Sequence, residues 1–443
     1  MAAPTRNHSR PLGLWSATAL VVGHTIGVGI FLTPAELIGA LAAPGLTLGL
    51  WLACGALVLA GAFTFGELAS RHPEAGGLYV YLRAAWGRRI AFLFGWQCLL
   101  VMDPGITAAL ALGLSQYLVI LWPRAAGSER WLALGTVWTL AVLNMAGLRL
   151  SVRVLNVLTA AKVAALSAIV VAAFAVGSGS VSHFLPVFAR RSGAPPLAEA
   201  LGLGLIGAFY SFGGFWEAAR VAGEVRDAPR TVPRALALGV ATVTTAYVAT
   251  TVAFLYLASP DKATSAASFA TGVGQALFGA HGPTAFASIV VLSVAASASA
   301  LLLMAPRLYL AMSRDGLFPA ALAAVHPVTG TPARATALLA ALASVYVLTG
   351  SFSQVAAFFM CPTLLFVALA AAGLLRERRR SPDVAGFRAP GQPATAALFV
   401  LLLLAVASFI VVARPLPALA GLALVLLGLP FAGAFVDRQG DGR

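Results

Sequence analysis

Residues 23–31 read Gly-His-Thr-Ile-Gly-Val-Gly-Ile-Phe, and they lie in the middle of an apolar segment long enough to cross a bilayer. Gly27 and Gly29 flank a single residue, which predicts an interrupted helix. Lipid cannot satisfy the exposed backbone groups of such a break, so it is tolerated only where it is buried or lines a cavity. The sequence Phe212-Gly213-Gly214 predicts a second break five segments later. Paired interrupted helices in corresponding halves point to the binding site of a transporter.

The composition predicts a polytopic membrane protein. Of 443 residues, 60% are hydrophobic and 10% are charged, whereas about a quarter of a soluble domain is charged. The net charge of +14 is spread over short loops, which favours membrane topology over nucleic-acid binding. The cysteines Cys54, Cys98 and Cys361 have no disulfide or metal spacing, and no enzyme or nucleotide-binding motif appears. We therefore expect no catalytic residues, no cofactor and no metal, and a gradient or exchange as the energy source.

Twelve candidate spans with soft edges follow from the apolar runs. They are residues 13–41, 45–69, 90–122, 131–149, 154–178, 198–222, 235–258, 284–312, 335–350, 353–375, 395–413 and 415–436. The two breaks are separated by five spans, so their helices have opposite orientations. This predicts an all-α fold with two inverted five-helix repeats, 13–178 and 198–375, in which helices 1 and 6 are broken. Two additional helices (395–436) and terminal tails (1–12 and 437–443) complete the chain.

The basic residues predict the orientation of the chain in the membrane. Of the 29 Lys and Arg residues, Lys162 lies within a span. With both termini inside, 22 of the remaining 28 fall on the cytoplasmic side and six fall outside. The positive-inside rule therefore predicts a multi-pass protein of the inner (plasma) membrane with both termini in the cytoplasm.

The two breaks offer complementary partial charges. Amides of Gly27, Val28 and Gly29 would begin the outer half-helix, where free N–H groups and the helix dipole favour a carboxylate. Carbonyls near residues 24–26, at the end of the inner half, favour an ammonium group. The second break repeats this arrangement around residues 211–214, so the pair matches a zwitterionic amino acid. The alternative is a glycine kink that only permits close helix packing, and the pairing of the breaks favours the ligand.

Lys162 is the strongest single candidate for a functional residue. It lies about nine residues into its span, or about 13 Å deep. A charge near the midplane is expensive and is a functional hypothesis by default. The amine could exchange a proton during a transport cycle, and the alternative is a static amine satisfied by carbonyls.

Three further titratable residues are candidates with open alternatives. Asp103 precedes Pro104 inside the third span, where it could meet a cationic substrate group, take a proton, or cap a local distortion. Glu217 follows the second break as a gating or proton-linked acid, or as an acid facing a water-filled vestibule. His24 could titrate near neutrality, or act as a hydrogen-bonded core histidine.

Three hydroxyl-bearing residues complete the set. Tyr210 precedes the second break, where it could cover a bound substrate or serve in packing. Ser297 and Ser299 could offer hydroxyl groups to an intramembrane cation, or bond to carbonyls of their own helix.

Five motifs, in order, resemble those of the amino acid–polyamine–organocation superfamily, and within it bacterial relatives of the L-type amino acid transporters. The resemblance covers about residues 12–395. The motifs are residues 23–31 with Thr33-Pro34; Glu67-Leu68 to Pro73 with Gly76-Gly77 and residues 79–82; Phe212-Gly213-Gly214 to Glu224-Val225 with Pro229 and Pro233; residues 314–319 with His326-Pro327 and Gly330-Thr331-Pro332; and Phe387-Arg388-Ala389-Pro390.

The resemblance implies the LeuT-type fold and transport by alternating access. It implies substrate contacts on residues 25–29 and 210–214, namely Thr25, Ile26, Gly27, Val28, Gly29, Tyr210, Ser211, Phe212, Gly213 and Gly214. Tyr210 matches a gating aromatic residue. Lys162 matches the helix 5 lysine of sodium-independent members, whose amine takes the place of a sodium ion between helices 1, 5 and 8.

The implied function is sodium-independent amino acid transport by proton symport or exchange. Asp103 is the candidate for specificity toward cationic amino acids or amines, and Glu217, His24, Ser297 and Ser299 join Lys162 and Tyr210 as coupling or gating candidates. The alternatives are a polyamine or cationic amino acid antiporter, and a sensor of the same fold without net transport.

Three departures from the family pattern matter. Val28 stands where many relatives have serine, so backbone amides must hold the carboxylate. His24 replaces a small residue, and Glu217 is one position beyond the helix 6 glutamate of some relatives. Human-type relatives join a heavy chain through a cysteine between helices 3 and 4, and residues 121–131 contain none. We therefore expect no disulfide-linked heavy chain, no nucleic acid, and a monomer or homodimer whose partners are a small-molecule substrate and the bilayer.

Overall fold

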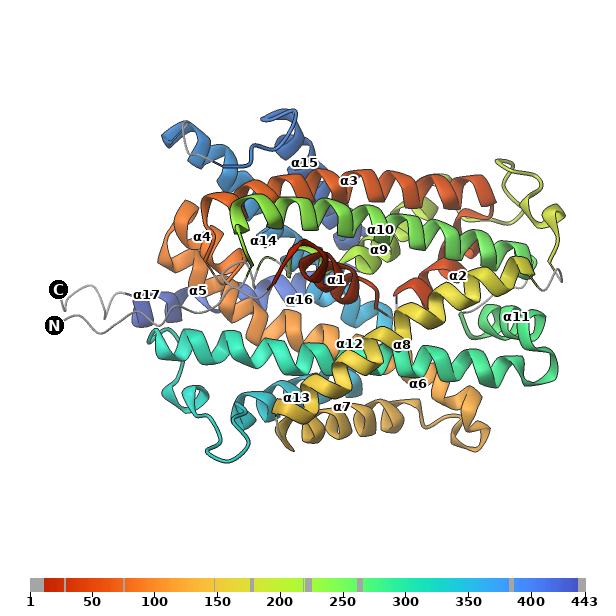
Figure 1. Cartoon of the computed structure of the whole chain (residues 1–443), viewed down its shortest axis with the longest axis horizontal. Helices are drawn as coiled ribbons and strands as arrows, with labels where there is room; N and C mark the ends of the chain where they lie inside the picture. Colours follow the sequence, from red (N-terminus) through yellow and green to blue (C-terminus); the bar gives the residue numbers. More distant parts are fainter. Residues whose placement is uncertain are drawn as a thin grey trace.

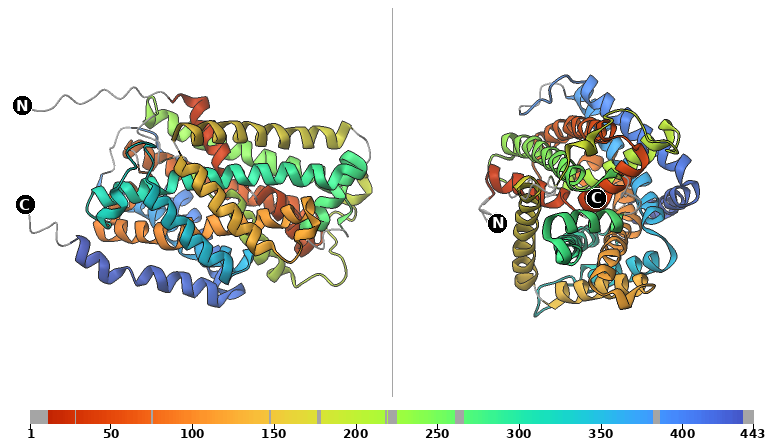
Figure 2. Two further views of the ribbon diagram at one scale, coloured as in Figure 1. Left: turned by 90° about the horizontal axis from the view of Figure 1, so that it is seen from below. Right: turned by 90° about the vertical axis from the view of Figure 1, so that its right-hand side faces the viewer.

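The structure is a computed structural model that describes residues 12–27, 29–74, 76–146, 148–175, 179–217, 219, 225–260, 266–381 and 386–436. In these ranges the regular structure is helical, apart from one isolated bridge between Leu12 and Val225. Most of the long helices run along the long axis of the molecule (Figure 1). The beginning of α1 and the end of α17 lie at the same end of the molecule (Figure 2, left), and we call it the terminal end.

The helices follow one another with short connections. In chain order they are α1 (Leu14–Thr25), α2 (Gly29–Leu41), α3 (Pro44–Arg71), α4 (Leu78–Trp86), α5 (Arg88–Gln97), α6 (Asp103–Leu121), α7 (Glu129–Ala146), α8 (Leu148–Ala175), α9 (Leu197–Phe212), α10 (Ala228–Leu257), α11 (Ala266–Phe278), α12 (Gly282–Arg314), α13 (Ala333–Thr349), α14 (Phe352–Arg380), α15 (Ala394–Ala413), α16 (Pro415–Leu426) and α17 (Leu429–Val436). A π-helical turn, η1 (Cys98–Met102), joins α5 to α6.

Local sequence signals set several of the helix boundaries. Pro44 is the first residue of α3. Proline has no backbone N–H, and at this position the N–H of any other residue would lack a partner within the helix. Gly87, with φ +88°, separates α4 from α5 in a conformation that favours glycine. Ser351 and Gln354 form a reciprocal capping box at the start of α14.

The chain is a multi-pass membrane protein. Eight helices of the described ranges are long and apolar enough to cross a membrane, or nine if α1 and α2 form one broken span. The predicted spans 131–149, 154–178 and 335–350 correspond to α7, α8 and α13, which are not among these eight helices. The number twelve and the inverted repeat therefore stay predictions.

The first predicted interruption is present. Helix α1 ends at Thr25, α2 begins at Gly29, and their axes differ by 52°. Val28, one of the predicted contacts, lies outside the described residues. A Cβ added to Gly29 would lie 2.4 Å from Ser211 Oγ and 2.8 Å from Ser211 Cα. Glycine is therefore required here because the start of α2 lies against the end of α9.

The chain is also interrupted at the second predicted position. Helix α9 ends at Phe212, and Gly214 adopts φ +97°, which residues with a side chain rarely adopt. A single-turn 3₁₀ segment follows from residue 215. A Cβ on Gly214 would lie 3.3 Å from the carbonyl oxygen of His24. The two interruptions therefore lie against each other.

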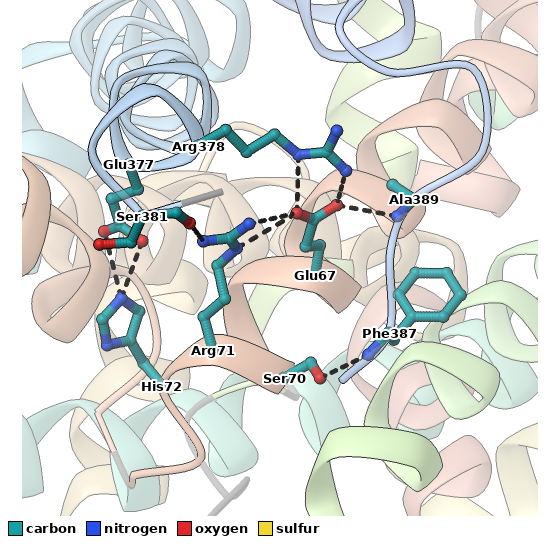
Figure 3. Close-up of polar contacts among 9 residues, drawn as sticks. All are labelled: Glu67, Ser70, Arg71, His72, Glu377, Arg378, Ser381, Phe387 and Ala389. Carbon is teal, nitrogen blue, oxygen red and sulfur yellow. Dashed lines mark hydrogen bonds and ion pairs between the residues drawn. The ribbon is translucent and has the colours of Figure 1, made fainter. Parts of the chain in front are cut away.

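A buried charge cluster fastens α3 to α14 at their carboxyl ends (Figure 3). The Glu67 carboxylate is completely buried. It accepts hydrogen bonds from Arg71 Nε at 3.2 Å and Nη2 at 3.1 Å, and from Arg378 Nε at 2.7 Å and its Nη2. The backbone N–H of Ala389, in the segment before α15, donates at 2.8 Å. One carboxylate thus joins α3, α14 and the segment that precedes α15.

We expect Glu67→Gln to destabilise the protein, because both guanidinium groups lose their buried counter-charge. Removing one partner of a buried ion pair costs about 3–5 kcal/mol. Thermal unfolding of the purified protein measures this effect. The matched control is Glu74→Gln, since Glu74 pairs with Arg83 at 3.4 Å on the surface, where such a pair contributes about 0–1 kcal/mol. Equal unfolding temperatures for the two variants would refute the role of the cluster.

Candidate functional site

A cavity of about 160 Å³ lies beside both helix interruptions. Its walls are mostly apolar, as expected for a small-molecule site with a few convergent polar groups. The lining residues are Leu20, His24, Thr25, Gly27, Gly29, Met102, Asp103, Ile106, Leu110, Phe209, Tyr210, Ser211, Gly213, Gly214, Trp216, Glu217, Ser297, Ala300, Leu301, Met304, Phe359, Met360, Thr363 and Leu364. Most of the predicted contacts line this cavity, but Ile26 and Phe212 do not.

Lys162, on α8, reaches the end of α1. Its Nζ donates to the carbonyl oxygens of Gly23 at 3.0 Å and Ile26 at 2.5 Å, and to Ser297 Oγ of α12 at 3.3 Å. The side chain is 3% exposed. The amine therefore connects three helices and occupies two of the carbonyls at the end of α1.

Tyr247, which the sequence reasoning missed, bridges the two interruptions. Its hydroxyl oxygen lies 3.0 Å from the Thr25 carbonyl oxygen and 2.7 Å from that of Ser211, so its single proton serves both acceptors. The ring is completely buried and packs against Trp51 and Phe212. The segment 235–258 also contains Phe254 and Tyr256, so nothing in the sequence distinguishes Tyr247 from residues that serve in packing.

We expect Tyr247→Phe to weaken the contact between the two interruptions while keeping the ring packing. The lost hydrogen bond is worth about 0.5–1.5 kcal/mol, and an acceptor left unsatisfied adds to that cost. The measurement is thermal unfolding together with substrate affinity. Thr245→Val is the control, because its exposed hydroxyl bonds only to the Ala241 carbonyl of its own helix. A Tyr247→Phe variant that matches this control would contradict the bridge.

His24 and Thr25 also make contacts within their own helix. His24 Nδ1 lies 3.0 Å from the Leu20 carbonyl oxygen, and the imidazole lines the cavity. Thr25 Oγ1 donates to the Val21 carbonyl oxygen at 2.8 Å, so this hydroxyl is engaged within its own helix. Ile26 is buried.

At the second interruption, aromatic rings pack together on the side away from the terminal end. Tyr210 packs edge-on against Phe352, with ring centroids 5.5 Å apart, and tilts against Phe359 at 6.3 Å. Ser211 Oγ donates to Thr33 Oγ1 at 2.9 Å, which joins α9 to α2. Phe212 instead packs away from the cavity.

Asp103 lines the cavity from the first residue of α6. It directly follows the π-helical turn η1, and such turns are frequent at functional sites. Its Oδ2 accepts a hydrogen bond from the Tyr309 hydroxyl at 2.7 Å, and the side chain is buried. Glu217 lines the same cavity from the turn that follows the second interruption.

The two predicted serines of α12 have different surroundings. Ser297 faces Lys162 and the cavity, whereas Ser299 Oγ accepts a hydrogen bond from Asn144 Nδ2 of α7 at 3.1 Å. Side chains two positions apart on an α-helix point about 200° apart around its axis, so the two serines cannot face the same group. Ser299 therefore supports the packing of α7 on α12 in this structure.

These observations define a membrane protein with two adjoining helix interruptions and a small, mostly apolar cavity beside them. The amino acid permease family model matches residues 12–428, so the chain belongs to that family. The superfamily resemblance found in the sequence is confirmed.

The chain is similar to amino acid transporters over most of its length. The b(0,+)-type amino acid transporter 1 of Oryctolagus cuniculus is 28% identical over 382 residues, which cover 84% of this chain and 77% of the relative. The cystine/glutamate transporter of Homo sapiens is 28% identical and covers 85% and 75%. The large neutral amino acids transporter small subunit 2 of Homo sapiens is 28% identical and covers 96% and 81%. The family and these relatives are transporters rather than enzymes, as predicted.

Proposed function

We propose that this chain is a sodium-independent secondary transporter of amino acids that works by alternating access. The observation that carries the proposal is the pair of adjoining interruptions that borders a cavity of about 160 Å³. Paired broken helices form the substrate sites of transporters built from inverted repeats. The proposed architecture is twelve spans, with two inverted five-helix repeats and two additional helices.

The substrate carboxylate binds at the start of α2, where Gly27 and Gly29 line the cavity. The substrate ammonium binds carbonyl oxygens of the second interruption. Lys162 occupies the Gly23 and Ile26 carbonyls of the first interruption, and Tyr247 shares its proton between the carbonyls of Thr25 and Ser211. We therefore assign the ammonium to the second interruption, where side chains occupy fewer carbonyls. The apolar part of the substrate then lies against the Leu, Ile and Met side chains of α6 and α12.

The structure resembles a state that faces the terminal end. The cavity is lined by Leu20 and His24 of α1, Glu217 after α9 and Met304 of α12, all on that side of the interruptions. On the other side, Tyr210 packs against Phe352 and Phe359. We propose that Tyr210 is the outer gate, and that the terminal end is cytoplasmic, in agreement with the distribution of basic residues.

Sodium independence is supported by Lys162, whose amine already supplies a positive charge to carbonyls of α1 and a hydroxyl of α12. We expect uptake to be unchanged when choline replaces sodium. Dependence on sodium would contradict this part of the proposal. Stimulation by an imposed proton gradient identifies symport, and stimulation by internal amino acid identifies exchange.

Flux of labelled amino acids in proteoliposomes tests the proposal as a whole. A transporter shows saturable accumulation that unlabelled substrate competes for. Saturable binding to the purified protein without flux would instead identify a sensor of the same fold.

Asp103 is the proposed specificity residue, because it places a carboxylate in a mostly apolar cavity. We expect Asp103→Asn to reduce uptake of a cationic substrate such as lysine relative to leucine. A charged hydrogen bond is worth about 1.5–3 kcal/mol, which corresponds to roughly a tenfold to hundredfold change. Competition assays in proteoliposomes measure the ratio. Tyr309→Phe is the control, since it removes the hydroxyl bonded to Asp103 and keeps the charge. An unchanged lysine-to-leucine ratio in Asp103→Asn would exclude this role.

A further inference from the structure

A second cavity, of about 70 Å³, lies apart from the helix interruptions. It is enclosed by the end of α7, the second half of α12, the connection between α12 and α13, and the start of α13. Its polar lining consists of Asn144, Arg307, Thr331 and Thr336. The α12–α13 connection lies at the terminal end (Figure 2, left), so the cavity is close to one surface of the membrane.

Asn144 presents a buried acceptor without a donor. The residue is 3% exposed, and its Nδ2 donates to the Leu140 carbonyl oxygen at 2.8 Å and to Ser299 Oγ at 3.1 Å. These two contacts fix the orientation of the amide, because a flipped amide would point its oxygen at a carbonyl oxygen. Oδ1 has no hydrogen-bond partner within the part of the chain that the structure describes. Such a group calls for a donor from outside the described residues, which a bound ligand can supply.

Arg307 is a charged donor for which the described residues supply no acceptor. It is exposed, and no hydrogen bond or ion pair to it occurs among the described residues. It lies seven residues before the end of α12, which places it about 10 Å inside that end. An exposed guanidinium group near the end of a membrane-spanning helix is stabilised by an anion, and basic pockets between membrane helices bind lipid headgroups.

The surroundings favour a lipid over a soluble anion. Val325 lines the cavity and is 38% exposed, and Val328 of the same connection is 87% exposed. Exposed valines at the membrane surface suit contact with lipid rather than with water.

We propose that this cavity binds the headgroup of phosphatidylethanolamine from the adjoining leaflet. The phosphate accepts hydrogen bonds from Arg307, and the ammonium group donates to Asn144 Oδ1. The cavity has room for about two waters, which suits the ethanolamine end while the phosphate remains at the entrance. A bound headgroup would brace α7 against α12, the helix that carries Ser297.

Native mass spectrometry of the delipidated full-length protein with equal amounts of phosphatidylethanolamine and phosphatidylcholine tests this site. Phosphatidylcholine carries the same phosphate but no N–H donor. We expect wild type to retain phosphatidylethanolamine with about tenfold preference. Arg307→Gln should lose binding of both lipids, and Asn144→Leu should bind both without preference. The control is Arg334→Gln, an exposed arginine at the start of α13 outside the cavity, which should behave as wild type.

Three results would overturn the proposal. Wild type that does not distinguish the two lipids would mean that the cavity holds water only. Arg307→Gln that binds both lipids as wild type does would remove the phosphate contact. An equal loss in Arg334→Gln would indicate general surface charge. The comparison of two lipids on wild type and Arg307→Gln stands even if Asn144→Leu fails to fold.

Discussion

Uptake by the Lys162→Ala variant is expected to fall roughly a hundredfold, while the variant still inserts and purifies. Lys162 donates to two carbonyl oxygens at the end of α1 and to Ser297 of α12. Without the amine, these buried acceptors are left unsatisfied, at about 1–3 kcal/mol each. A loss of about 3 kcal/mol in the transport-competent arrangement corresponds to that reduction in rate. Initial uptake rates in proteoliposomes, measured over a range of pH, provide the test.

The matched control for Lys162 is a pair of serine variants on α12. Ser297→Ala removes a contact of the amine and should lower uptake in part. Ser299→Ala leaves the amine untouched, because Ser299 bonds to Asn144. Uptake in Lys162→Ala that keeps the wild-type rate and pH dependence would refute the role of the amine.

Gly29→Ala is expected to destabilise the contact between the two helix interruptions, although it adds only one methyl group. The added Cβ would lie 2.8 Å from the Cα of Ser211, so backbone rather than a flexible side chain would have to move. Overpacking of this kind costs about 1–3 kcal/mol, occasionally more. We therefore expect a lower unfolding temperature and loss of substrate binding.

Gly27→Ala is the control for this steric effect. Its Cβ would meet only Ser297 Oγ, at 3.9 Å, so its unfolding temperature should stay close to that of wild type. The account of the helix contact fails if Gly29→Ala and Gly27→Ala unfold at the same temperature as wild type.

The sequence predicted those features of the site that break a strong local rule. Glycines such as Gly29 and Gly214 inside apolar segments indicated the interruptions. A single amine within a predicted span, that of Lys162, indicated a functional residue. In each case an ordinary lipid-facing helix offers no physical reason for the residue, so the pattern is informative without a structure.

The features that were not predicted depend on direction and distance. Tyr247 looks like packing in the sequence, and only the fold brings its hydroxyl to the carbonyls of two other helices. Ser297 and Ser299 differ only in helical phase relative to α8 and α7. The boundaries of α7, α8 and α13 were close to those predicted, but α13 and the apolar stretch of α8, Ala160–Ala175, are shorter than the eight membrane-span candidates.

A cryo-EM structure with a saturating transported amino acid tests the central claim most directly. We expect a zwitterion in the cavity beside the start of α2 and the end of α9, with its carboxylate within hydrogen-bond distance of the α2 amides. A substrate bound elsewhere, with this cavity empty, would contradict the claim.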